Sequence, residues 1–560
     1  MTLHLAPGTS WPETLRRAVA LTPEGFAEDR LRNLVEGTWQ DSGSPAPLRT
    51  PVDGTLLTQL PRLDAETAKV AVGFAAAEHR TWAGTPLAER IARVEAALDA
   101  LTGARDLLAL LLVWEIGKPW RLACADVDRA LDGVRWYVTQ IERQLGYVAG
   151  GAGPGREPLS GREPLPGPVS NIASWNYPMS VLVHAELVQL LAGNAVIAKT
   201  PSQGGAVCLT VAHALMRRAG LPVTLLSGSG EELSEVLVRA PEIGAVAFVG
   251  GRSNGGKVAA ALLSAAQSGP RSSDGRPEPG ADKRHMIEQE GLNAWGIWEF
   301  SQWDMLAGHL KKGFEYGKQR CTAYPRFVVQ RDLVDKFLDA YLPVVKSIRF
   351  GHPLAVADPY EHSGSRSSDG RAETFADPLP ELDFGPLISA AKADELHRKV
   401  EESIRAGAIP LYRGSLADSA GFLDGQDTSA YVAPVTLLAP PGRSRLMHAE
   451  PFGPVDTIVV VDTEEELLAA MNASNGALVA SLACDNQELA GKLAKDLQAF
   501  KVGINKPRSR GDREEPFGGR GASWKGAFVG GDLLVHAVTL GEPDERLYGN
   551  FPDYNSYPAT

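Results

Sequence analysis

Short apolar runs alternate with helical segments between residues 169 and 251, and this alternation limits the possible folds more than any other feature of the chain. The pattern predicts strands over 169–173, 195–198, 223–226 and 243–249, with a helix ending at Leu191 and another over 206–219. Continuous apolar strands that alternate with helices are typical of a parallel sheet covered on both faces. The predicted fold class is therefore α/β.

Ligands of such sheets bind beyond the carboxyl ends of the strands. Asn176, Lys199, Gly228 and the pair Gly250 and Gly251 each follow a predicted strand, so we expect them to line one crevice. Simpler roles remain open at this point. An asparagine at a strand–helix junction commonly caps the helix, and a single lysine is usually a surface residue.

Composition excludes several classes of protein. A chain of 560 residues exceeds what one core covers, so two or three lobes are expected. The net charge of 56 − 68 = −12 argues against a nucleic-acid partner. Four widely spaced cysteines predict neither a disulfide framework nor a metal site. No long uninterrupted apolar run or apolar leader is present, so we expect a cytoplasmic protein with no membrane partner.

Two segments, 268–282 and 363–377, match each other at 11 of 15 positions. Both are rich in Gly, Ser and charged residues and have no apolar face. A duplicated ligand loop is one interpretation, but the segments lack the convergent carboxylates that a metal ion needs. We expect two surface insertions.

Cys321 lies 33 positions after Glu288. A cysteine is an effective nucleophile once ionised, and a carboxylate can act as its base or activate a water molecule. Most free cysteines are only small apolar core residues, so this pair alone decides little.

Seven motifs in chain order resemble those of the aldehyde dehydrogenase superfamily, over roughly residues 35–540. They are Trp175–Pro178, Gly193–Lys199, Phe248–Gly251, Glu288–Ala294, Gly317–Ala323, Glu450–Pro454 and Pro516–Gly519. The resemblance implies a Rossmann-like cofactor domain (1–146 and 169–291), a second α/β catalytic domain (292–500) and a small β oligomerisation element (147–168 and 501–560). It also implies a homodimer or homotetramer.

The resemblance further implies that a small aldehyde is oxidised to the carboxylic acid with NAD or NADP. Cys321 would attack the aldehyde to form a thiohemiacetal, and loss of hydride would leave a thioester. The Asn176 amide and the Cys321 N–H would hold the oxyanion. Glu288 would activate the water that hydrolyses the thioester.

Other residues are implied to bind the cofactor. Glu450 resembles the carboxylate that holds the nicotinamide ribose, with Phe452 beside it, and Lys199 resembles the lysine that reaches the adenosine ribose. The remaining expected cofactor residues are Trp175, Ser202, Gly228, Gly250 and Gly251.

Three departures from the family pattern bear on these roles. Glu290 replaces the first glycine of the usual Glu-Leu-Gly-Gly, and Gly251 stands where a serine is usual. Ser202 stands where a glutamate commonly binds both adenosine ribose hydroxyls and repels a 2′-phosphate. We therefore hypothesise that NADP is accepted, with Lys199, Ser202 or Arg252 near the 2′-phosphate.

Two other functions remain open. An acylating relative would pass the thioester to coenzyme A, although such enzymes generally lack the base that Glu288 supplies. A catalytically impaired, dehydrogenase-like structural subunit is the second alternative, because Glu290 crowds Glu288.

Overall fold

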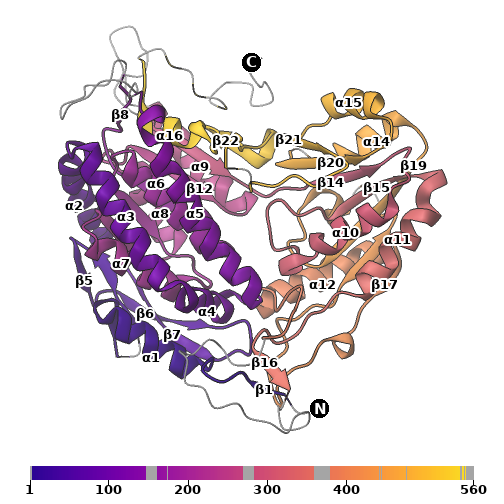
Figure 1. The fold of residues 1–560 in the computed structure, drawn as a ribbon, viewed down its shortest axis with the longest axis horizontal. Coiled ribbons are helices and arrows are strands. Elements are labelled where there is room, and N and C mark those ends of the chain that lie inside the picture. The colour runs from indigo at the N-terminus through magenta and orange to yellow at the C-terminus, as the bar shows by residue number, and fades with distance from the viewer. Residues whose placement is uncertain are drawn as a thin grey trace.

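A computed structural model describes residues 3–549, except 29, 147–160, 173, 269–282, 358–378, 441, 443, 475, 512, 543–544, 546 and 548. Two lobes lie side by side, each built on its own sheet (Figure 1). Both repeated segments fall almost wholly outside the described residues, and so does most of 147–168. Within the described part of the chain, no helix has the length and apolar character needed to cross a bilayer.

The first lobe contains an eight-stranded sheet. Its strands in spatial order are β22 (Trp524–Gly526), β13 (Arg284–Glu288), β12 (Ala245–Val249), β9 (Val169–Ile172), β10 (Val196–Lys199), β11 (Val223–Leu226), β4 (Asn33–Val35) and β5 (Thr38–Gln40). The five strands from β13 to β11 are parallel, whereas β22 and β4 pair antiparallel at either end of this group. The predicted α/β class is confirmed.

The central strands are buried because helices cover both faces of this sheet. All four residues of β10 and of β11 are buried. The helices packed on the sheet are α2 (Ala65–Ala83), α8 (Gly230–Arg239) and α9 (Arg252–Ser268) on one face and α6 (His184–Leu191) and α7 (Ala206–Arg218) on the other. An outer layer of α3 (Leu87–Gly103), α4 (Arg105–Ile116) and α5 (Trp120–Gln144) packs on α6 and α7. Continuous apolar strands between two helical layers are the arrangement that the sequence pattern predicts. A π-helical turn (Pro178–Val183) precedes α6, which the periodicity does not predict.

The second lobe contains a seven-stranded sheet. Its order is β17 (Ile409–Arg413), β18 (Val435–Leu438), β19 (Val455–Val461), β15 (Arg326–Gln330), β14 (Ala294–Ile297), β20 (Val479–Ala483) and β21 (Lys501–Ile504). Its helices are α10 (Trp303–Gly313), α11 (Val334–Lys346), α12 (Ala390–Arg405), α13 (Arg445–His448), α14 (Glu464–Met471) and α15 (Gln487–Lys495). All strand pairs except β17 with β18 are parallel.

The N-terminal residues add two smaller sheets. A four-stranded sheet contains β2 (Phe26–Ala27), β3 (Arg30–Leu31), β7 (Leu56–Arg62) and β6 (Ser44–Arg49). Strand β1 (Leu3–Leu5), which precedes helix α1 (Trp11–Leu21), pairs with β16 (Ala355–Ala357). The latter pair joins the N-terminus to the second lobe.

The C-terminal residues are divided among three sheets. Strand β21 closes the second sheet, β22 closes the first, and β23 (Thr539–Leu540), which follows helix α16 (Asp532–Ala537), pairs with β8 (Glu163–Pro164). This division differs from the expected one, in which residues 501–560 belong to a single oligomerisation element. The difference arises because long-range strand pairing leaves no periodic signal in the sequence.

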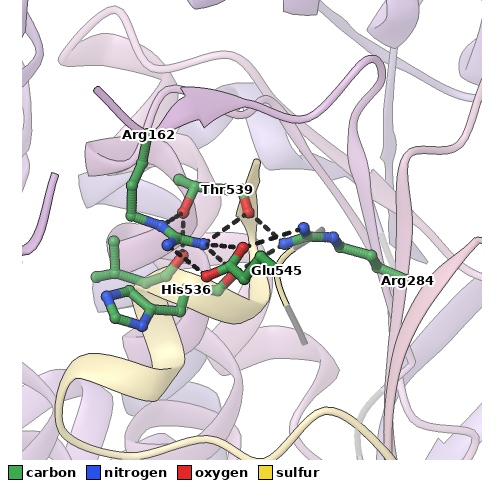
Figure 2. A network of polar contacts seen from close by, with 6 residues as sticks. Arg162, Arg284, His536, Thr539 and Glu545 are labelled. Atoms are coloured by element: carbon green, nitrogen blue, oxygen red, sulfur yellow. Dashed lines mark hydrogen bonds and ion pairs between the residues drawn. The ribbon is translucent and has the colours of Figure 1, made fainter. Parts of the chain in front are cut away.

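A network of ionic and polar contacts attaches β8 to the C-terminal segment (Figure 2). Arg162 contacts the Glu545 carboxylate at 2.6 Å and donates to Thr539 Oγ1 at 2.7 Å. Arg284, on β13, reaches the same segment from the other side and donates to the His536 carbonyl at 2.8 Å. Two guanidinium groups therefore hold one carboxylate and the carbonyls around it.

Candidate active site

A cavity of about 440 Å³ opens at the carboxyl edge of the first sheet and is closed on its other side by the second lobe. Its volume falls in the range of small-molecule sites. From the first lobe its lining includes Trp175, Asn176, Gly250, Gly251, Glu288 and Glu290, and from the second Cys321, Lys392, Lys399, Glu450 and Phe452. Eight of the expected site residues thus share one cavity.

A strained turn precedes Cys321 and positions its side chain at this cavity. Tyr316 and Lys318 both have φ of 60°, a left-handed conformation that residues other than glycine rarely adopt. The Tyr316 hydroxyl donates to the Ile116 carbonyl at 3.0 Å, and Lys318 Nζ donates to Asp456 Oδ1 at 2.5 Å. Such strain persists only where surrounding contacts fix the backbone, so the position of the thiol is tightly specified.

The connection between the two sheets also touches the cysteine. Asn293 Nδ2 donates to the carbonyls of Cys321 at 2.8 Å and Ala323 at 2.7 Å. A Cβ at Gly291 would lie 2.2 Å from the Cys321 carbonyl oxygen, so only glycine permits this approach. The segment after Glu288 therefore fixes the backbone of the segment that contains Cys321.

Asn176 is buried beside the cysteine loop. Its Nδ2 donates to the Gln319 carbonyl at 3.0 Å, and its Oδ1 accepts from the Ser174 hydroxyl at 2.5 Å. The following π-helical turn starts after Tyr177 and has no side-chain cap, so Asn176 does not cap it. The amide is instead held near Cys321, on the wall of the cavity.

The charges around the thiol are mostly negative. Burial raises the pKa of Cys321 well above its usual value, and the charges of Glu288 and Glu450 raise it further, whereas Arg510 acts in the opposite direction. Glu288 is itself buried and pairs with Arg510, whose Nη1 lies 3.1 Å from Glu288 Oε2. Nothing in the sequence motifs points to Arg510, because it belongs to a loop that follows β21.

Three carboxylates, those of Glu290, Glu395 and Glu450, and two lysines line the remainder of the cavity, and Glu395 pairs with both lysines. Burial and the charge of Glu290 raise the pKa of Glu450, and burial raises that of Glu290. Burial lowers the pKa of Lys392, with the charge of Lys399 acting in the same sense. Sequence reasoning missed both lysines, although their spacing of seven places them on one face of helix α12.

Three expected cofactor residues lie along the same sheet edge but do not line this cavity. Lys199 is buried and donates to the Thr200 carbonyl at 3.0 Å, and burial lowers its pKa to about 8. Ser202 is exposed. A Cβ at Gly228 would lie 2.5 Å from the Leu233 side chain, so this glycine allows helix α8 to pack against the strand end.

The residues of the cavity fit a nicotinamide dinucleotide. Glu450 Oε1 is buried without a hydrogen-bond partner, and such an acceptor suits ribose hydroxyls. The rings of Trp175 and Phe452 meet edge to face at 5.7 Å on the same wall. By contrast, the described residues contain no group of three or more His, Cys, Asp or Glu side chains arranged to hold a metal ion.

The fold and the cavity together define a two-lobed α/β enzyme with a cysteine at the carboxyl edge of a nucleotide-binding sheet. Residues 39–539 match the model of the aldehyde dehydrogenase family, and the chain belongs to that family. It is an NAD(P)-dependent aldehyde dehydrogenase, which oxidises an aldehyde to the carboxylic acid. The expected family and activity are thus confirmed.

Similar proteins span nearly the whole chain. Mitochondrial succinate-semialdehyde dehydrogenase of Mus musculus is 25% identical over 526 residues, which are 92% of this chain and 91% of the relative. NADP-dependent glyceraldehyde-3-phosphate dehydrogenase of Streptococcus equinus is 25% identical over 520 residues, with 91% and 97% covered.

Solved structures share the fold. NADP-dependent glyceraldehyde-3-phosphate dehydrogenase of Bacillus halodurans C-125, complexed with NADP, has a TM-score of 0.75 at 24% identity and covers 91% of this chain and 98% of its own. A 1-pyrroline-5-carboxylate dehydrogenase mutant of Thermus thermophilus has a TM-score of 0.76 at 22% identity, with 94% and 95% covered.

Proposed function

We propose that Cys321 is the nucleophile of this aldehyde dehydrogenase, that Asn176 stabilises the oxyanion and that Glu288 is the base. The observation that carries the proposal is the meeting of these three residues, distant in sequence, on one cavity at the sheet edge. A thiol, an amide donor and a carboxylate are the groups that thiohemiacetal formation and thioester hydrolysis need.

The reaction begins when the Cys321 thiol loses its proton to solvent and the thiolate sulfur bonds to the aldehyde carbon. Charge that develops on the aldehyde oxygen is stabilised by Asn176 Nδ2 and the Cys321 N–H. NAD(P)+ held at the sheet edge would supply a hydride acceptor, and loss of hydride from the thiohemiacetal carbon would leave a thioester on Cys321.

Hydrolysis of the thioester regenerates the enzyme. Glu288 takes a proton from a water molecule, whose oxygen bonds to the acyl carbon as the carbon–sulfur bond breaks. The carboxylic acid leaves, and the sulfur of Cys321 keeps the bonding electrons.

We assign the cofactor to the sheet edge. Trp175, Gly250, Gly251, Glu450 and Phe452 would surround its nicotinamide end, which the orphaned Glu450 oxygen supports. Lys199, Ser202 and Gly228 would follow along the ends of β10 and β11. Because Ser202 carries no charge to repel a 2′-phosphate, we expect NADP to be accepted.

The experiment is a stopped-flow burst of reduced cofactor on mixing enzyme, NAD(P)+ and a panel of aldehydes. In the first turnover the wild type should release up to one reduced cofactor per site. It should then release the carboxylic acid at a rate that does not change when coenzyme A is added. Cys321→Ser should lose the burst, whereas Cys484→Ser, which alters a buried thiol that does not line the cavity, should keep it. A burst that survives Cys321→Ser would contradict the assignment.

We also propose a homodimer or homotetramer and a cytoplasmic location. The paired strands β8 and β23 form a small sheet apart from the two large ones, which supports assembly through that element. Four free cysteines, three of them buried, favour a reducing compartment.

A further inference from the structure

Glu288 has one cationic partner among the residues that the structure describes. Arg510 Nη1 donates to Glu288 Oε2 at 3.1 Å, although the two residues are 222 positions apart. The Glu288 side chain is 2% exposed and that of Arg510 is 26% exposed. Since solvent screens a buried pair far less than a surface pair, this contact fixes the carboxylate strongly.

Glu288 also lies between two cavities. The larger one holds Cys321 but is not lined by Arg510. The smaller one, of about 40 Å³, is lined by Arg510 and, apart from Asn171 and Gln189, by apolar groups. The guanidinium and the thiol therefore line different cavities, and Glu288 lines both.

The two carboxylate oxygens of Glu288 consequently differ. Oε2 is anchored by Arg510, whereas Oε1 is buried and has no hydrogen-bond partner. Burying a carboxylate oxygen without a hydrogen-bond donor costs free energy unless a ligand or a water molecule donates to it. Oε1 is thus the atom available to a water molecule in the active site.

Arg510 is itself held in place. Its guanidinium lies 5.3 Å from the centre of the Phe517 ring. Within the same loop the backbone N–H of Arg508 donates to the Tyr324 hydroxyl at 2.8 Å. Because Tyr324 follows Cys321 by three residues, the loop that carries Arg510 is tied to the segment that carries the thiol.

We propose that Arg510 is a positioning residue for thioester hydrolysis, which holds Glu288 Oε2 so that Oε1 meets the attacking water. This inference rests on the proposed function. In the assisted step the water oxygen bonds to the acyl carbon, the carbon–sulfur bond breaks with its electrons going to Cys321, and the water proton passes to Oε1. Without Arg510 the carboxylate would be an unpaired buried charge, which would turn away or take up a proton.

The test compares Arg510→Met and Arg510→Lys with Arg513→Met. Arg513 belongs to the same loop but donates to the Asp132 carbonyl, away from Glu288. Arg510→Met should keep the full burst amplitude of reduced cofactor, while steady-state kcat falls at least about tenfold, as expected when a base is misplaced. The KM for aldehyde should stay the same or fall, since acyl-enzyme accumulates. Arg510→Lys should recover part of kcat, and Arg513→Met should match the wild type.

Hydroxylamine adds a second readout. Its nitrogen attacks the thioester directly, so it should restore turnover of Arg510→Met and yield the hydroxamate without help from Glu288. A raised KM with unchanged kcat would show that Arg510 binds the aldehyde, and loss of the burst in folded Arg510→Met would show a role in acylation. Either result overturns the inference. The absence of a burst in the wild type would overturn the proposed function instead, so the two failures are distinguishable.

Discussion

Ser202 departs from the family pattern at a position that affects the choice between NAD and NADP. It is exposed, three positions after Lys199, at the carboxyl edge of the first sheet. We expect kcat/KM for NADP to equal or exceed that for NAD, and Ser202→Glu to lower the NADP value at least tenfold, or about 1.4 kcal/mol, through repulsion of the 2′-phosphate. Steady-state kinetics with both cofactors measure this, with Ser202→Gln as the uncharged control. A wild-type preference for NAD above about tenfold would contradict the prediction.

A buried ion pair joins the turn before Cys321 to strand β19. Lys318 and Asp456 are 3% and 0% exposed, and the Tyr341 hydroxyl also donates to Asp456 at 2.7 Å. Lys318→Met should lower the free energy of unfolding by about 3–5 kcal/mol, because it leaves a buried carboxylate without its partner. Arg398→Met removes an exposed pair with Glu402 and should cost less than about 1 kcal/mol. Denaturant unfolding compares the two variants, and equal losses would contradict the role given to burial.

At the scale of the whole molecule, Glu545 joins the C-terminal segment to the first lobe (Figure 2). Burial acts to raise the pKa of Glu545, but the nearby Arg162 and Arg284 lower it overall. A lowered carboxyl pKa means that the contact stabilises above the unfolded pKa and is lost as the pH falls through the folded pKa. Glu545→Gln should therefore loosen the β8–β23 pair at neutral pH, with weaker assembly in sedimentation velocity and faster proteolysis of the C-terminal segment. Glu542→Gln, on the same segment, is the control, and identical behaviour of both variants would contradict this role.

The sequence alone determined the local elements and the family. Strands β10, β11 and β12 and helix α7 lie within two residues of their predicted bounds, because a buried parallel strand reads as a continuous apolar run and a helix as a 3.6-residue period. The motifs around Asn176, Glu288 and Cys321 were visible for a different reason: each is a short contiguous string that resembles a motif of the family.

Only the tertiary structure decided which distant residues meet. Asn176 contacts Gln319 across 143 positions, and Arg510 reaches Glu288 across 222. Strand β22, close to the C-terminus, completes the first sheet rather than a separate element. Periodicity records which face of an element is buried, but not which other element covers it. Only the packing of the folded chain brings Arg510 to the buried carboxylate of Glu288.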